Sequence, residues 1–170
     1  NYRKLVILLP QPSDCSRQYK LFHDDFGERI VHAIIDDIEI CVFPQEGLLN
    51  NPGTAELITA SLENGATVVG AAPYTDTDPK GQIDHIFKVA REYDVDIDMH
   101  LDFADHTESF DLDYVCYLTE KYRYGGKVAI GHVTKLSFVD ASTFIEKARR
   151  LANSGVSVSV LPSTDLFLMG

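Results

Sequence analysis

Residues 94–106, DVDIDMHLDFADH, contain the strand on which the fold assignment depends. Apolar and polar residues alternate up to His100, as in a half-buried β-strand, and carboxylates follow it within a few positions. Apolar residues at helical spacing precede this segment over residues 82–94, and a second helical pattern follows it over residues 110–123. The segment is therefore predicted to be one strand of a β/α repeat.

The same alternation of strands and helices extends in both directions from this segment. Strand starts recur at intervals of about 30 residues, which is the length of a βαβ unit, so we expect parallel strands with right-handed crossovers. The predicted strands are residues 38–43, 66–72, 95–100, 127–132 and 156–162, and residues 4–10 could form another. The predicted helices are residues 54–64, 82–94, 110–123 and 138–155.

Local signals fix several of the helix ends. Gly65 is expected to be the C′ residue that ends the helix over residues 54–64. Asp111 and Asp113 belong to the first turn of the helix over residues 110–123, where they favour its dipole. Thr107 or Ser109 is expected to cap the N-terminus of that helix.

The predicted fold class is α/β, in the form of a (β/α)₈ barrel. A complete barrel has eight β/α units and usually about 250 residues, whereas this chain of 170 residues carries about five or six. We therefore expect one domain over residues 1–170 that forms an internal portion of a barrel, although residues 1–30 show little readable pattern. An open flavodoxin-like sheet is the alternative, but no GxGxxG or P-loop motif follows any strand.

Composition excludes several classes of function. The formal net charge of −11 argues against binding to nucleic acid, whose phosphates would be repelled. No apolar run approaches the roughly 20 residues of a membrane span. Cys15, Cys41 and Cys116 are far apart and have no metal-binding spacing, so a reducing, cytoplasmic setting is expected. A homo-oligomer is left open.

Residues capable of chemistry fall at the carboxyl ends of the predicted strands, the edge at which parallel α/β folds build their active sites. His100 and His132 end consecutive strands and could point at a common centre, since neutral imidazole is a common metal ligand. Asp102 is close enough to the first of these ends to take part. A solvated acidic loop remains the structural alternative, because a single histidine in such a position is more often a loop residue. The other predicted strand-end candidates are Gln45, Thr134, Ser163 and Asp165.

Five blocks resemble the cytosine deaminase-like branch of the metal-dependent amidohydrolase superfamily, in the same order and at similar spacing. They are FPQEG (43–47), GATVVGAAPY (65–74), VDIDMHLD (95–102), GGKVAIGHVTKLS (125–137) and SGVSVSVLPSTDLFL (154–168). The fold of that family is a (β/α)₈ barrel, and the resemblance implies that this chain covers roughly strands 3 to 7 of it. The resemblance implies hydrolysis of a C–N bond, other than a peptide bond, in a small nitrogen heterocycle such as a pyrimidine or triazine.

The resemblance also assigns roles to individual residues. It implies that His100 is a metal ligand, that His132 acts on the reacting water or the transition state, and that Gln45 binds the ring edge. Asp102 is expected to shuttle protons. The fourth family strand, ATVVGAA here, carries no lysine to bridge two metals, so a single divalent ion, zinc or iron, is implied.

The chain also departs from the family pattern. No HxH pair occurs, and the metal-binding aspartate of the eighth strand would lie beyond Gly170. Phe103 occupies the position of the catalytic glutamate of cytosine deaminase. The alternative function is therefore a catalytically decayed barrel relative that serves as a ligand-binding or scaffold protein.

Overall fold

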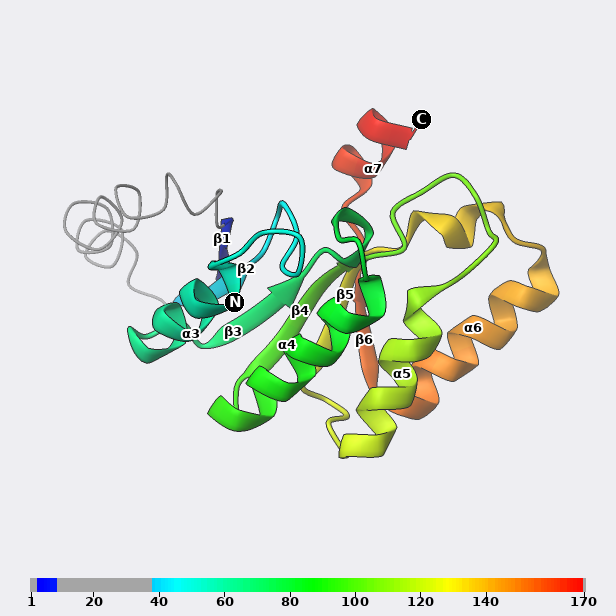
Figure 1. Ribbon diagram of the computed structural model, residues 1–170. Helices are drawn as coiled ribbons and strands as arrows, with labels where there is room; N and C mark the ends of the chain where they lie inside the picture. The colour runs from blue at the N-terminus through cyan, green and yellow to red at the C-terminus, as the bar shows by residue number, and fades with distance from the viewer. Residues whose placement is uncertain (1–2, 9–37, 170) are drawn as a thin grey trace.

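The computed structural model describes residues 3–8 and 38–169, and its central element is a parallel sheet (Figure 1). The strands are β1 (Arg3–Leu8), β2 (Ile38–Phe43), β3 (Val68–Ala71), β4 (Asp96–Leu101), β5 (Val128–His132) and β6 (Val156–Ser159). Each strand pairs in parallel with the next one in the chain. All the predicted strands are present, and β1 confirms the strand suggested for residues 4–10.

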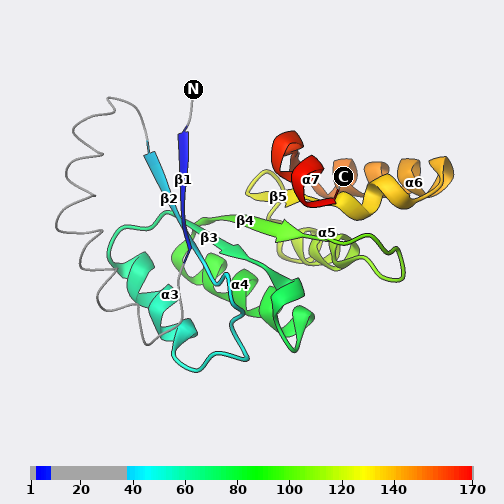
Figure 2. The ribbon, with the colours of Figure 1, turned by 90° about the horizontal axis from the view of Figure 1, so that it is seen from above.

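The strand order is β1-β2-β3-β4-β5-β6, so every connection moves the chain one place along the sheet in the same direction. A doubly wound sheet reverses its direction at a switch point, and therefore the flavodoxin-like alternative is wrong. Helices α3 to α6 consequently succeed one another along one side of the sheet (Figure 1). Seen from above, the strand direction turns strongly between β1 and β4 (Figure 2). This is the order expected for part of a (β/α) barrel.

The helices are close to those predicted. They are α3 (Thr54–Glu63), α4 (Pro79–Tyr93), α5 (Asp111–Tyr122), α6 (Ala141–Ser154) and α7 (Pro162–Met169), with 3₁₀ turns η2 (Pro73–Thr75) and η3 (Thr134–Phe138). Gly65, with φ 104°, ends α3 as expected. α4 begins three residues earlier than predicted, because Asp78 accepts a hydrogen bond from Gly81 N–H and Pro79 suits the first turn.

The last predicted strand, residues 156–162, is shorter in the structure. β6 ends at Ser159, and Pro162 begins α7 instead. A proline has a fixed φ that suits the first turn of a helix, which explains the early end of the strand. Residues 9–37, which include most of the unreadable N-terminal region and Cys15, lie outside the described residues.

β4 has two different faces. Ile97, Met99 and Leu101 are buried in the core between the sheet and the helices. The alternate residues Asp96, Asp98 and His100 are only partly buried. Residues 96–101 therefore form a strand whose polar face ends in His100. Within the described ranges, no helix is both long and apolar enough to span a membrane.

Candidate functional site

The imidazoles of His100 and His132 meet at the carboxyl ends of β4 and β5. Their ring centroids are 4.7 Å apart, with the planes at 82°, so one ring presents its edge to the other. The two strands are neighbours in the sheet, and His100 is in register with Gly131. The two histidines that the sequence places at consecutive strand ends are therefore in contact, and their common role stays a prediction.

His132 reaches this position through an unusual backbone conformation. Strict alternation along β5 would put its side chain on the face of Val128 and Ile130, which are buried in the core. His132 instead has φ 69°, in the left-handed region that non-glycine residues seldom adopt. The strand ends there, and the ring lies against His100 on the opposite face.

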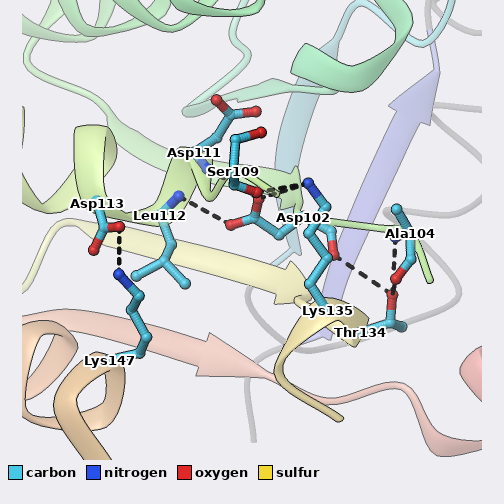
Figure 3. Close-up of polar contacts among 9 residues, drawn as sticks. All are labelled: Asp102, Ala104, Ser109, Asp111, Leu112, Asp113, Thr134, Lys135 and Lys147. Carbon is cyan, nitrogen blue, oxygen red and sulfur yellow. Dashed lines mark hydrogen bonds and ion pairs between the residues drawn. The ribbon is translucent and has the colours of Figure 1, made fainter. Parts of the chain in front are cut away.

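Asp102 also has a left-handed conformation, with φ 50°, but its side chain turns the other way. Alternation would place it on the face of His100, yet its carboxylate is fully buried and meets the start of α5 (Figure 3). Oδ1 accepts from Asp111 N–H and Oδ2 from Leu112 N–H, both at 2.9 Å. Within the described residues, neither oxygen forms a hydrogen bond or ion pair with His100 or His132.

Asp102 therefore supplies the cap of α5. The helix has Phe110 at its N-cap position and receives no side-chain hydrogen bond from it, so the prediction that Thr107 or Ser109 caps the helix is wrong. Two orphan N–H groups of the first turn are satisfied across nine and ten residues of sequence. A local sequence rule considers only neighbouring residues, and this is why it misses the cap.

Lys135 joins the same buried cluster from the loop after β5. Its side chain is only 9% exposed, its Nζ donates to Ser109 O at 2.9 Å, and it lies 3.6 Å from Asp102 Oδ1 (Figure 3). Burial is the largest influence on Asp102 and raises the pKa of its carboxyl, while the two helix N–H groups act in the opposite direction. The cluster fastens the β4–α5 loop to the β5 loop.

Phe103 is held between two anchored residues. Asp102 on one side is fixed by α5, and Ala104 on the other exchanges hydrogen bonds with Thr134, whose Oγ1 accepts from Ala104 N–H at 3.1 Å and donates to Ala104 O at 3.2 Å. The Phe103 ring lies 5.0 Å from the ring of His132, edge to face. An aromatic ring therefore packs on the histidine from the position at which the family has its glutamate.

Further aromatic rings line the pair. The Phe43 ring at the end of β2 is 4.6 Å from that of His100, and the Tyr74 ring is 6.1 Å from that of Phe103. Gly70 on β3 leaves room for Phe43, since a Cβ there would lie 2.6 Å from Phe43 Cδ2. Flat apolar surfaces of this kind suit a planar ring ligand.

Asp165 contacts the second histidine from the first turn of α7. Its Oδ1 lies 2.6 Å from His132 Nδ1, and the two side chains are 16% and 7% exposed, respectively. The sequence predicts Asp165 just after a strand and indicates no role for it. Nothing in the spacing of 33 residues could have indicated this contact.

His100 has the electrostatic character of a neutral imidazole. Burial lowers its pKa below the ordinary value of 6.5, and the neighbouring His132 lowers it further, while Asp98 acts in the opposite direction. A neutral imidazole keeps the nitrogen lone pair that a metal ligand needs. His100 therefore fits the predicted role chemically.

The described residues do not provide a complete set of metal ligands. Catalytic zinc sites commonly use three protein ligands. In residues 3–8 and 38–169, no group of three or more His, Cys, Asp or Glu side chains is placed to hold a metal ion. The described residues thus supply only part of the donor set that the resemblance implies.

Gln45, predicted to bind a ring edge, follows β2 in the turn after Phe43, where its N–H donates to Phe43 O at 3.1 Å. Its side chain is partly buried. The structure thus brings together His100, His132, Phe43 and Phe103 by direct ring contacts. Gln45 lies at the same edge of the sheet, two residues after Phe43.

Comparisons with known proteins agree with this architecture. A pterin deaminase of Rhizobium rhizogenes is 25% identical over 129 residues, which are 76% of this chain and 29% of that protein. An N-isopropylammelide isopropyl amidohydrolase of Pseudomonas sp. strain ADP is 32% identical over 115 residues, 66% of this chain and 28% of that protein. No protein-family model matches the chain.

Among solved structures, the 5-methylcytosine deaminase of Klebsiella pneumoniae liganded with phosphonocytosine superposes with a TM-score of 0.77. The two sequences are 24% identical. The superposed region covers 91% of this chain and 37% of that protein. The chain resembles part of a cytosine deaminase-like amidohydrolase. The family resemblance and the barrel-type fold predicted from the sequence are confirmed. The chain spans less than a third of the length of either curated relative.

Proposed function

We propose that the protein is a metal-dependent amidohydrolase that hydrolyses a C–N bond, other than a peptide bond, in a small nitrogen heterocycle. The observation that carries the proposal is the edge contact of His100 and His132 at consecutive strand ends. The carboxyl edge of a (β/α) barrel is where such enzymes place their chemistry. Relatives named for action on pterin and N-isopropylammelide support a planar, nitrogen-rich substrate.

Each side chain then has a defined task. His100 supplies one ligand to a single divalent ion, zinc or iron, which when bound lowers the pKa of water toward about 7. His132 takes a proton from the attacking water or passes one to the leaving amine. Gln45 hydrogen-bonds the ring edge, and the rings of Phe43 and Phe103 border the place where the substrate lies.

The proposal gives Asp102 a supporting task in place of the proton shuttle predicted from the sequence. Both of its carboxylate oxygens are committed to N–H groups of α5. A shuttle must exchange protons with the substrate, and a fully buried carboxylate engaged in this way is poorly placed to do so. We propose that Asp102 instead holds Phe103 against His132.

Metal content tests this proposal directly. In the intact protein, His100→Ala is expected to abolish stoichiometric zinc or iron, measured by elemental analysis. Turnover of amino- or alkylamino-substituted pyrimidines, triazines and pterins, measured as released ammonia or amine, should fall at least about 10³-fold. His106→Ala is the matched control, because His106 is exposed in the loop that follows β4.

Two results would count against the proposal. Unchanged metal stoichiometry in His100→Ala would remove His100 from the ligand set. A wild-type protein that binds planar heterocycles but purifies without metal and releases no amine would instead identify the decayed, ligand-binding relative. The packing of the Phe103 ring on His132 is the observation that favours this second function.

A further inference from the structure

We propose that Asp165 is the positioning residue of His132, and that it fixes the neutral ring as the Nδ1–H tautomer with Nε2 unprotonated. The two groups come from separate loops, the end of β5 and the first turn of α7. His132 Nδ1 and Asp165 Oδ1 are 2.6 Å apart, which is hydrogen-bond distance. The catalytic consequence rests on the proposed function, whereas the tautomer itself does not.

The direction of the hydrogen bond follows from the chemistry of the two groups. An ionised carboxylate can only accept, so the nitrogen that faces it must carry the proton. A neutral imidazole has one N–H, and placing it on Nδ1 leaves a lone pair on Nε2. Low exposure of both side chains keeps water from competing for the same positions.

Asp165 is itself oriented by its own helix turn. Its N–H donates to Leu161 O at 2.9 Å, and its second carboxylate oxygen, Oδ2, accepts from Leu161 N–H at 3.3 Å. The carboxylate therefore has one oxygen for the backbone and one for the histidine. Because the two oxygens have different partners, the isosteric variant Asp165→Asn changes the group that faces His132 without changing the shape of the side chain.

In Asp165→Asn the amide oxygen is expected to stay on Leu161 N–H, which needs an acceptor. The amide NH₂ group would then face His132 and could only donate to it. Nδ1 would have to accept, and the proton would move to Nε2. The variant thus reverses the tautomer while it preserves the shape of the side chain.

The test uses ¹⁵N-histidine-labelled intact protein, freed of metal, at one fixed pH at which the ring is neutral. The ¹⁵N shifts of the His132 ring should show a protonated Nδ1 in the wild type and a protonated Nε2 in Asp165→Asn. With metal restored, Asp165→Asn should lower kcat/KM by about 10–100-fold, and Asp165→Glu should recover part of that loss.

Asp140→Asn is the matched control, because Asp140 caps α6 through Ser142 and Thr143 and forms no hydrogen bond or ion pair with a histidine of the described residues. It should change neither the His132 shifts nor kcat/KM. An Nε2–H tautomer in the wild type would overturn the proposal, as would an Nδ1–H tautomer retained in both Asp165→Asn and Asp165→Ala. Reversal of the tautomer in a protein that hydrolyses no heterocycle would refute the proposed function and leave this inference standing.

Discussion

The ends of β4 and β5 share a left-handed backbone conformation, but it turns one side chain away from the histidine pair and the other toward it. Asp102 leaves β4 with φ 50°, and His132 leaves β5 with φ 69°, so both adopt the left-handed conformation. At β4 the turn takes a carboxylate from the histidine face to the start of α5. At β5 it takes an imidazole from the core face to the edge of His100.

The difference lies in how the strain is offset. Each left-handed non-glycine residue costs about 1–3 kcal/mol and persists only where the surroundings hold it. Asp102 is held by two helix N–H groups and Lys135, so its strain is offset within the buried cluster. At β5, Val133 is also left-handed, with φ 50°, although β-branched residues rarely tolerate this. Strain concentrated beside a contact of two histidines is the pattern of a functional site.

The largest expected effect is at the buried cluster. Asp102→Ala removes the cap of α5 and leaves the ammonium of Lys135 buried without its carboxylate. We expect a loss of about 3 kcal/mol in the free energy of unfolding, measured by urea denaturation. The matched variant Asp102→Ala/Lys135→Met should recover part of this loss, because it also removes the unpaired charge.

The same variant tests the comparison of the two strand ends. If Asp102 is structural, turnover by the fraction that remains folded should fall far less than in His132→Ala. A variant of unchanged stability with no turnover would show instead that Asp102 is the proton shuttle, and the two strand ends would then both serve the chemistry.

A smaller effect is expected where the two loops are joined. Thr134→Val is close in shape but removes the hydroxyl that accepts from Ala104 N–H and donates to Ala104 O. We expect a loss of about 1 kcal/mol in unfolding free energy, and faster hydrogen exchange at the Ala104 amide. Thr119→Val, which removes a hydroxyl within α5, is the control, since it should leave exchange at Ala104 unchanged. Unaltered Ala104 exchange in Thr134→Val would mean that Phe103 is held by its ring contacts alone.

The sequence predicts the frame of this site well, because the frame follows from periodicity. Alternation along β4 is enough to assign Ile97 and Met99 to the core and His100 to the other face. The order of β/α units is enough to bring His100 and His132 to one edge of the sheet. Both inferences depend only on neighbouring residues and on the handedness of the crossovers.

The remaining features depend on exceptions to that periodicity. Aspartate and histidine take positive φ more often than most non-glycine residues, but too seldom for the sequence to predict it at Asp102 or His132, and a β-branched valine takes it more rarely still. Contacts such as Asp165 with His132 and Lys135 with Ser109 join residues 33 and 26 positions apart. The geometry of the site is therefore set by tertiary contacts, and the predicted capping by Thr107 or Ser109 fails for the same reason.

The smallest expected effect concerns His85, a histidine in α4 that gives a reference for burial alone. Its Nε2 is buried and has no hydrogen-bond partner in the described part of the chain. Burial lowers the pKa of His85 below 6.5, Lys88 adds to this, and Glu56 acts in the opposite direction.

The folded protein therefore holds fewer protons at His85 than the unfolded chain does as the pH falls below about 6.5. Unfolding free energy then rises with pH, so the stability contributed by the neutral ring is present above 6.5 and lost on acidification through the lowered pKa. Replacing His85 with Gln should flatten this part of the pH profile of urea unfolding relative to the wild type. An identical slope in His85→Gln and the wild type would contradict the lowered pKa of His85.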